Sequence, residues 1–321
     1  RAVIKVKGER GAKITLRFSE TLNKEGGIDR GSLRNAENTD VYIGLDYPLN
    51  KSHWEGYNLI RAYLTEYKKN NIFRSFNIIF REFNLGASGN VDDLIEMISK
   101  QYDRWIFTED DNIFSPNFLV YINKGLELYK EDKSVFAISG YRNFYPIKFG
   151  SNTFFRQNVA FSAWGYAVWR ERHEMCSRID ANYFRKTFSF STFLKLRKQS
   201  GNYSALFYFK YAFSNGYLKK EDNLLSVFAA INGMDIIMPT ISLVRNIGVD
   251  GSGEHFKMIS NKLRKLHDEQ IISEDCDFEY IGTGMEFYEE NRKIFRDSCY
   301  GKISSLRLII RIIKFFINRK L

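Results

Sequence analysis

Residues 104–116 read RWIFTEDDNIFSP, and this stretch indicates the fold class of the chain most directly. The apolar run at residues 105–107 predicts a strand, and three consecutive acids end it. A strand that is apolar throughout is typical of an α/β sheet, because helices cover both faces of such a sheet. The Ser-Pro pair that follows the acids is suited to open a helix. We therefore expect a strand, a polar turn and a helix in this order.

The three acids of this turn are Glu109, Asp110 and Asp111. They follow the carboxyl end of the expected strand, which is the edge where α/β sheets bind ligands. Adjacent carboxylates repel one another, and a cation relieves that repulsion. Oxygen ligands of this kind suit Mg²⁺ or Mn²⁺ bound to substrate phosphates. A solvated acidic turn that caps the next helix explains the same residues, and their spacing alone favours neither interpretation.

Expected strands and helices alternate on both sides of this turn. Strands are expected at residues 13–18, 41–45, 76–80 and 135–139. Helices with one apolar face are expected at residues 55–69, 91–102 and 116–129. This alternation predicts a doubly wound, mostly parallel sheet. Asp46 directly follows the second strand, where a carboxylate accepts hydrogen bonds from a ribose or a base; a simple turn before Pro48 is the alternative.

Composition limits the classes of partner. The chain has 321 residues, 44% of them hydrophobic and 16% aromatic, which is enough for a large core. Its net charge of +10 suits nucleic acid, an anionic membrane or a phosphorylated substrate. Three cysteines without a CxxC pair argue against a disulfide framework or zinc knuckle and fit a reducing cytoplasm. The opening residues show no secretory leader. No nucleic-acid-binding motif is recognisable, so nucleic acid is not an expected partner.

The second half of the chain holds three further candidate segments. Residues 161–172 read FSAWGYAVWRER, in which Trp164-Gly165 forms either an aromatic loop over a ligand or a tight turn in the core. Asp222 precedes an apolar helix and is suited to cap it. Residues 245–255 read RNIGVDGSGEH, a glycine-rich loop closed by His255. This histidine is a candidate ligand for a metal or a phosphate, although a lone histidine is usually structural or solvated.

Residues 302–321 read KISSLRLIIRIIKFFINRKL and predict a basic amphipathic helix. The segment carries too many cations for a membrane-spanning helix. We expect it to lie in the interface of an anionic membrane, which would place the protein peripherally on the inner face of the cell membrane. Packing against the body of the protein is the competing interpretation.

Several of these segments together resemble one family, the bacterial GT-A-fold glycosyltransferases. They are the strand-EDD-SP-helix unit, SVFAISGY at residues 134–141, FSAWGYAVW, the acid before an amphipathic helix, and SLVRNIGVDGSGEH. The resemblance covers roughly residues 41–255 and is strongest to the family-2-like sugar transferases of polysaccharide gene clusters, with a distant likeness to N-acetylglucosaminyltransferase I. It departs from the family near the start, where glycines at residues 26, 27 and 31 interrupt the segment after the first strand.

The resemblance implies roles for the residues in the first half of the chain. The acidic triplet is similar to the family's DxD-type element, so Asp111 is expected on the divalent metal, with Asp110 and Glu109 in the donor-binding group. Asp46 is similar to the acid that contacts the nucleoside. Asn84 and Asn90 match a donor-binding region more loosely.

The resemblance also implies roles for residues in the second half. Trp164 and Gly165 match the loop that shapes the donor-sugar pocket. Glu221 and Asp222 match the acidic motif of inverting enzymes, with Glu221 expected to bind the donor and Asp222 expected to act as the catalytic base. His255 matches the late histidine that completes the metal or diphosphate site.

The expected protein is therefore a Mn²⁺- or Mg²⁺-dependent, inverting glycosyltransferase of surface polysaccharide biosynthesis. It would use a nucleotide-sugar donor, expected to be UDP-linked, and a glycan or lipid-linked saccharide acceptor. The GT-A fold implies a nucleotide-sugar-binding half at residues 1–150, an acceptor half of the same domain at 151–260 and a C-terminal extension at 261–321. A nucleotidyl or phosphoryl transferase could use the same acids, and a non-catalytic basic membrane-associated module is the non-enzyme alternative.

Overall fold

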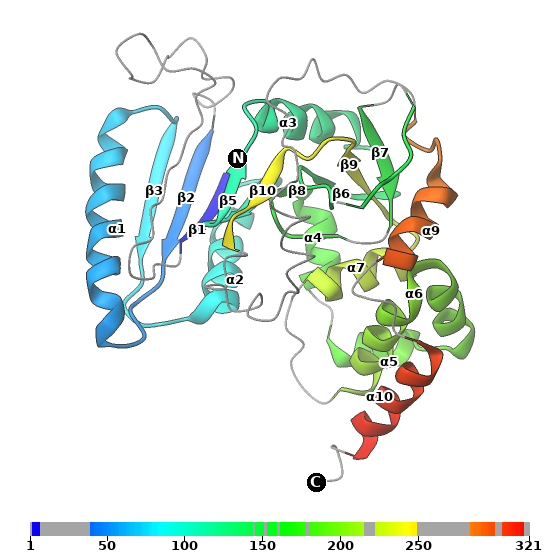
Figure 1. Ribbon diagram of the computed structural model, residues 1–321. Coiled ribbons are helices and arrows are strands. Elements are labelled where there is room, and N and C mark those ends of the chain that lie inside the picture. The colour runs from blue at the N-terminus through cyan, green and yellow to red at the C-terminus, as the bar shows by residue number, and fades with distance from the viewer. Residues whose placement is uncertain are drawn as a thin grey trace.

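The fold is that of a computed structural model, which describes residues 2–6, 39–143, 145–150, 153–158, 161–177, 180–214, 222–248, 283–298 and 304–317. These residues form a mixed α/β structure built on one eight-stranded sheet in the order β3-β2-β1-β4-β8-β6-β9-β7 (Figure 1). The strands of this sheet are β1 (Ala2–Val6), β2 (Asp40–Leu45), β3 (Ser75–Phe80), β4 (Arg104–Glu109), β6 (Val135–Ser139), β7 (Phe154–Gln157), β8 (Tyr166–Trp169) and β9 (Asp235–Pro239). A separate antiparallel pair joins β5 (Asn112–Phe114) and β10 (Val244–Asn246).

Helices connect and cover these strands. Before β6 they are the 3₁₀ turn η3 (Lys51–His53), α1 (Trp54–Tyr67), the 3₁₀ turn η4 (Lys68–Asn70), α2 (Gly86–Ser99) and α3 (Phe118–Leu128). Later in the chain they are α4 (Arg170–Ser177), α5 (Ala181–Thr187), α6 (Phe190–Phe213), α7 (Asp222–Ile231), α9 (Tyr288–Ser298) and α10 (Ser305–Ile317). None of the helices in the described ranges is long and apolar enough to cross a membrane.

The sheet is mixed, whereas the sequence predicted a mostly parallel one. Strands β3, β2, β1, β4, β6 and β9 run in one direction, while β8 and β7 run in the other. A parallel connection needs a crossover of a dozen or more residues, usually a helix. No helix occurs in the described residues between β6 and β8, so the chain returns to the sheet there in the antiparallel direction.

The remaining predictions differ from the structure mainly at their boundaries. The strands expected at 41–45, 76–80 and 135–139 are present as β2, β3 and β6, and the strand at 105–107 is β4. Helix α2 begins five residues earlier than predicted, because Gly86 and its neighbours already form its first turn. The strand expected at 13–18 lies outside the described residues. The one strand described before residue 40 is β1, which the sequence did not predict.

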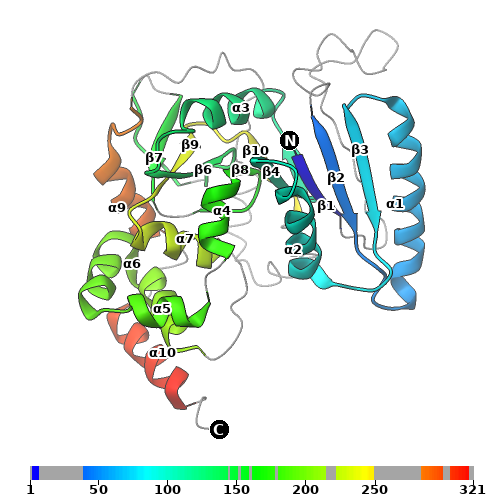
Figure 2. The same ribbon diagram turned by 180° about the vertical axis from the view of Figure 1, so that it is seen from behind.

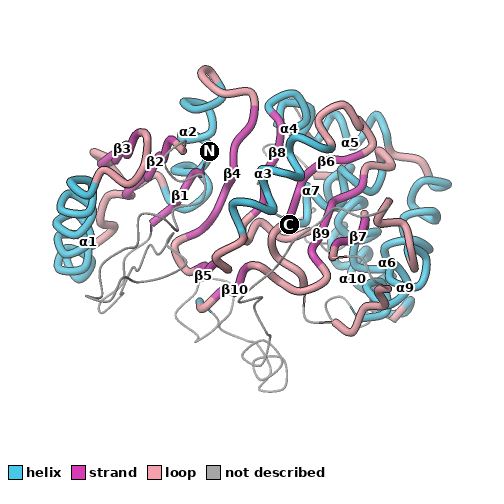
Figure 3. Tube along the Cα trace, turned by 90° about the horizontal axis from the view of Figure 1, so that it is seen from above, coloured by secondary structure: helices cyan, strands magenta, loops and turns pink. Residues whose placement is uncertain are grey.

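Both faces of the sheet are covered, as the apolar β4 predicted. Trp105 and Phe107 of β4 face one buried cluster with α2 and α4–α7, while Ile106 between them faces a second cluster with α3. Helix α1 covers β2 and β3 on the same face as α3. Viewed along the sheet edge, α1 and α2 lie on opposite sides of the strands (Figure 3). Every side chain at the centre of β4 is thus removed from water.

The later helices form a layer of their own beside the sheet. Helix α6 is capped by Ser189, whose side chain accepts a hydrogen bond from the Thr192 amide at 3.0 Å. It bends at Gly201, which has a φ of +88°. Helices α9 and α10 pack against α6, and α10 lies at the outer end of this layer, far from β1–β3 (Figures 1 and 2).

Candidate active site

The acidic turn lies at the point where the strand order reverses. Strand β1 pairs in parallel with β2 on one side and with β4 on the other, and the chain reaches β4 only after β3. In open α/β sheets, ligands bind in the crevice outside the carboxyl ends of such strands. Lys5 of β1 lies opposite Glu109 of β4, so both strands end at the same edge of the sheet. Glu109, Asp110 and Asp111 are therefore at the edge where the sequence predicted a site.

Asp111 is held in place by β10, a strand more than a hundred residues later in the sequence. Asn246 of β10 donates from Nδ2 to Asp111 Oδ1 at 2.6 Å. The Ile247 amide donates to the Asp111 carbonyl at 2.7 Å. A Cβ on Gly248 would lie 2.3 Å from Asp111 Oδ2, so the backbone of this residue approaches the carboxylate closely. The side chain of Asp111 thus has a defined position between β5 and β10.

Trp164-Gly165 forms a tight turn that rests on the same strand pair. Gly165 has a φ of +71°, and a Cβ on it would lie 2.8 Å from Val244 Cγ2 and 3.2 Å from Phe114 Cε1. Glycine is required here both by the left-handed backbone and by the close approach of β10 and β5. Trp164 is half-buried and packs edge-on against Tyr141, with ring centroids 4.9 Å apart. The turn therefore connects the middle of the sheet to the strand pair that holds Asp111.

Asp222, the first residue of α7, reaches the start of this turn. Its Oδ2 accepts a hydrogen bond from the Ala163 amide at 3.1 Å. Burial raises the pKa of the Tyr166 hydroxyl, and the negative charges of Asp222 and, more weakly, Glu109 raise that pKa further. Two acids separated by more than a hundred residues are thus close enough to influence one phenol. The structure brings Asp111, Trp164-Gly165 and Asp222 into one connected region.

Asp46 and Asn84 lie along the same edge of the sheet. Asp46 Oδ1 accepts hydrogen bonds from the Tyr47 amide at 3.0 Å and the Leu85 amide at 2.8 Å. Asn84 Nδ2 donates to the Tyr47 carbonyl at 2.5 Å. These bonds tie the end of β2 to the loop that follows β3. Both side chains thereby hold together two segments at the carboxyl edge of the sheet.

Asn90 is fully buried within α2 and bonds to the chain itself. Its Nδ2 donates to the Gly44 carbonyl at 2.8 Å, and its Oδ1 accepts from Arg81 Nε at 2.8 Å. A Cβ on Gly44 would lie 2.4 Å from Asn90 Oδ1, so only glycine allows this contact. Asn90 fastens α2 to β2 just before the strand ends.

Two predicted site residues, Glu221 and His255, lie outside the described residues. Within the described ranges, no group of three or more histidine, cysteine, aspartate or glutamate side chains is arranged to hold a metal. Magnesium, however, is usually held by one or two carboxylates together with substrate phosphates and water. The carboxylates of Asp110 and Asp111 are ligands of this type.

The structure adds residues that the sequence did not single out. Asn246 and Gly248 position Asp111, but strands of three residues such as β5 and β10 carry no detectable periodicity. Tyr47, Trp54 and Tyr57 form an aromatic cluster beside Asp46, with Tyr47 and Trp54 centroids 5.3 Å apart. Trp54 is 39% exposed, so this cluster presents a ring to solvent near the carboxyl end of β2. In the sequence, only the spacing of these aromatic residues around Pro48 could have indicated the cluster.

Comparisons with known proteins give little further information. Residues 1–56 match the model of the bacterial alpha-L-rhamnosidase concanavalin-like domain, which is too small a part of the chain to establish membership. No curated protein matches the sequence. S. aureus TarS 1–349 is similar at 11% identity and a TM-score of 0.35, over 99% of this chain and 79% of its own.

A second solved structure is similar at the same level. The mannosyltransferase PcManGT from Pyrobaculum calidifontis, in complex with GDP-Man and Mn²⁺, shares 9% identity at a TM-score of 0.34, over 99% of this chain and 87% of its own. TM-scores this low do not establish a shared fold. Any assignment of function therefore rests on the arrangement of the chain's own residues.

Proposed function

We propose that this protein is a metal-dependent, inverting glycosyltransferase that uses a nucleotide-sugar donor. The observation that carries the proposal is the chain of contacts from Asp222 through Ala163 and Gly165 to the β5–β10 pair that holds Asp111. Motifs far apart in the sequence thus meet at the carboxyl edge of the sheet, next to the strand-order reversal. An acid for a metal and an acid for a base on neighbouring elements are what such a transfer requires.

The donor diphosphate would lie at the acidic turn. Asp111, with Asp110 beside it, would hold Mn²⁺ or Mg²⁺, because both side chains offer the oxygen ligands that these ions prefer. When bound, the metal neutralises charge that grows on the departing nucleoside diphosphate. The aromatic cluster beside Asp46 offers a ring for the nucleobase, and Asp46 borders the position of the ribose. His255 and Glu221 remain proposed contributors to the same donor site.

Asp222 would act on the acceptor. A carboxylate near the donor sugar can accept the proton of an attacking hydroxyl as the new glycosidic bond forms. Because a carboxylate is a weak base for a hydroxyl, proton transfer must accompany bond formation. The hydrogen bond from the Ala163 amide orients Asp222 toward the Trp164-Gly165 turn. Trp164 would supply an aromatic wall for the sugar. The acceptor would be a saccharide, free or lipid-linked.

The decisive experiment measures nucleoside diphosphate release from a panel of nucleotide sugars with and without Mn²⁺. Asp111→Asn and Asp222→Asn are expected to reduce turnover by about 10²-fold or more, because each removes a group that acts in the transition state. Glu96→Gln, which alters an exposed carboxylate paired with Lys100, serves as the matched control and should keep full turnover. Circular dichroism confirms that each variant is folded.

Two results would contradict the proposal. Wild-type turnover in both folded variants would remove the acids from the mechanism. Release of pyrophosphate in place of a nucleoside diphosphate would identify a nucleotidyl transferase that uses the same acidic turn.

A further inference from the structure

Helix α10 has two apolar faces, and only one of them packs against the protein. Leu308, Ile312 and Phe315 recur at helical spacing toward α6, where Leu308 is 3% exposed. Phe315 also contacts Phe209 of α6, with ring centroids 6.1 Å apart. The packing that the sequence left as an alternative is therefore present. This packing covers only one of the two apolar faces of α10.

The opposite side of α10 presents a continuous apolar stripe to solvent. Leu306, Ile310, Ile313 and Ile317 follow one another at the same helical spacing, and their exposed fractions lie between 42% and 67%. Soluble proteins rarely expose contiguous apolar patches without a partner. Arg307, Arg311 and Lys314 flank the stripe along one edge of the helix. Burial, and then the charge of Arg311, lowers the pKa of Lys210, so cations crowd together here.

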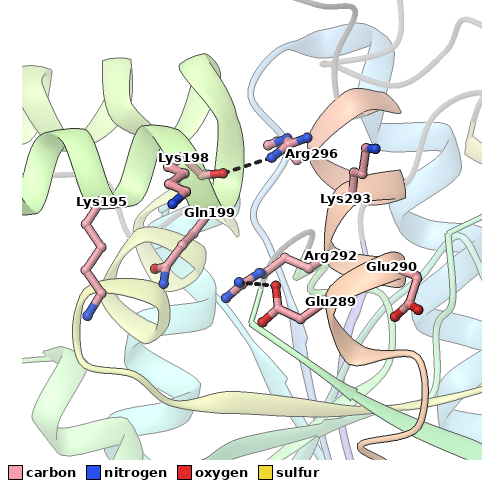
Figure 4. A pocket seen from close by; sticks show the side chains of 8 residues that line it. All are labelled: Lys195, Lys198, Gln199, Glu289, Glu290, Arg292, Lys293 and Arg296. Atoms are coloured by element: carbon pink, nitrogen blue, oxygen red, sulfur yellow. Dashed lines mark hydrogen bonds and ion pairs between the residues drawn. The ribbon is translucent and has the colours of Figure 1, made fainter.

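A cationic pocket lies between α6, on which α10 packs, and α9. A cavity of about 490 Å³ lies between α6 and α9, lined by Lys195, Lys198, Gln199, Glu289, Glu290, Arg292, Lys293 and Arg296. Figure 4 shows Arg292, Glu289 and Arg296 of α9 extending toward α6, whereas Glu290 and Lys293 extend from the other side of α9. Glu289 is paired with Arg292, but in the described part of the chain no ion-pair partner is found for Lys195, Lys198 or Lys293. The pocket therefore retains positive charge.

A second cavity connects this pocket with the apolar helix. It measures about 660 Å³ and shares Lys198 and Arg296 with the first, while Ser304 and Ser305 at the start of α10 form its other end. Arg197 donates to Ser305 Oγ at 2.6 Å and so fixes the start of α10 beside the cavity. The two cavities thus reach the start of α10, from which the exposed apolar stripe runs.

We infer that this surface, which we call the α6–α9–α10 face, docks on an anionic lipid bilayer. The apolar stripe of α10 enters the boundary between headgroups and acyl chains, and the flanking cations contact lipid phosphates. Lys195, Lys198 and Lys293 bind anionic headgroups in the adjoining pocket. A second copy of the chain fits less well, because a two-fold contact would bring the same cations face to face. The inference is independent of sugar transfer, since the surface lies away from the candidate active site.

Vesicle co-sedimentation of the full chain tests the inference. Binding is expected to vesicles of phosphatidylcholine mixed with phosphatidylglycerol, to be weak with phosphatidylcholine alone, and to fall with added salt. Ile310→Ser/Ile313→Ser removes part of the stripe, and Lys195→Gln/Lys198→Gln/Lys293→Gln removes the pocket charge. The loss of two apolar side chains is expected to weaken binding by about tenfold or more, because less apolar area enters the interface. The loss of three cations is expected to weaken binding by about a hundredfold, because each cation near an anionic surface contributes about fivefold.

Two control variants change residues of the same types elsewhere on the surface. They test whether the position of the substituted residues matters. Leu59→Ser changes an apolar residue of α1 that is 64% exposed. Lys68→Gln/Lys100→Gln/Lys130→Gln removes the same net charge elsewhere on the surface. Both should bind vesicles about as tightly as the wild type. Equal binding by all variants would overturn the inference. So would a wild-type dimer in sedimentation equilibrium that Ile310→Ser/Ile313→Ser dissociates, because the stripe would then be a contact between two copies.

Discussion

The side-chain amide of Asn246 donates to the carboxylate of Asp111 across 135 residues of sequence, at 2.6 Å. The same amide lies 3.2 Å from the Oδ1 of Asn112, the first residue of β5, so Asn246 contacts two adjacent residues of this segment. Asn246 is 1% exposed, so its side chain is held inside the protein. The orientation of the proposed metal ligand therefore depends on a residue that need not contact the metal.

If the proposed transfer takes place, Asn246→Ala is expected to weaken its activation by Mn²⁺. Side chains that orient a metal ligand typically account for 10- to 100-fold in metal affinity or activity, and we expect the Mn²⁺ concentration for half-maximal turnover to rise about tenfold. Turnover at saturating Mn²⁺ should fall less. Asn123→Ala removes a side-chain amide that donates to the Leu119 carbonyl within α3 and serves as the control. An unchanged Mn²⁺ dependence in a folded Asn246→Ala protein would show that Asp111 does not depend on this bond.

Alanine substitutions at Gly165 and Gly86 can separate two destabilising effects. One is the strain of an alanine at positive φ, and the other is the steric clash of its Cβ with neighbouring residues. Both have positive φ, at +71° and +69°, but nothing lies within 4 Å of a Cβ on Gly86, whereas a Cβ on Gly165 meets Val244 at 2.8 Å. Gly86→Ala is expected to lower the free energy of unfolding by about 1 kcal/mol from backbone strain alone. Gly165→Ala adds overpacking of about 1–3 kcal/mol. Urea denaturation measures both, and equal losses would contradict the close packing at Gly165.

The sequence predicted the local features of this molecule better than its long-range ones. Apolar segments identified β2, β3, β4 and β6 from composition. Strands β2, β4 and β6 are buried along most or all of their length, whereas the edge strand β3 is half-buried apart from Phe76. Nothing in residues 154–169 revealed that β7 and β8 are antiparallel, since direction depends on whether a helix intervenes. Likewise, Asp111 and Asp222 could be named from their segments alone. Their positioning by Asn246 and Ala163 could not, because those contacts are made by side chains and amides without a local pattern.

At the opposite end of β2 from the candidate site, Asp40 is predicted to make stability depend on pH. Its buried carboxylate accepts hydrogen bonds from Arg74, from Ser75 Oγ at 2.8 Å and from Tyr102 O–H at 3.0 Å. The Arg74 guanidinium is the largest cause that holds the pKa of Asp40 well below its ordinary value of 3.8. Because the unfolded chain binds a proton that the folded chain does not, this stabilisation is complete above pH 3.8 and is lost as pH falls further.

Asp40→Asn should therefore lower the free energy of unfolding at pH 7 by about 2 kcal/mol, the contribution of hydrogen bonds to a charged group. The difference from the wild type should shrink as the pH is lowered below about 4, since the wild-type carboxylate then loses its advantage. Urea denaturation between pH 7 and pH 3 measures it. Arg74→Gln leaves the carboxyl in place without its main partner, and it should flatten the same part of the pH profile. Parallel profiles for all three proteins down to pH 3 would mean that Asp40 titrates alike in the folded and unfolded chains, despite its burial.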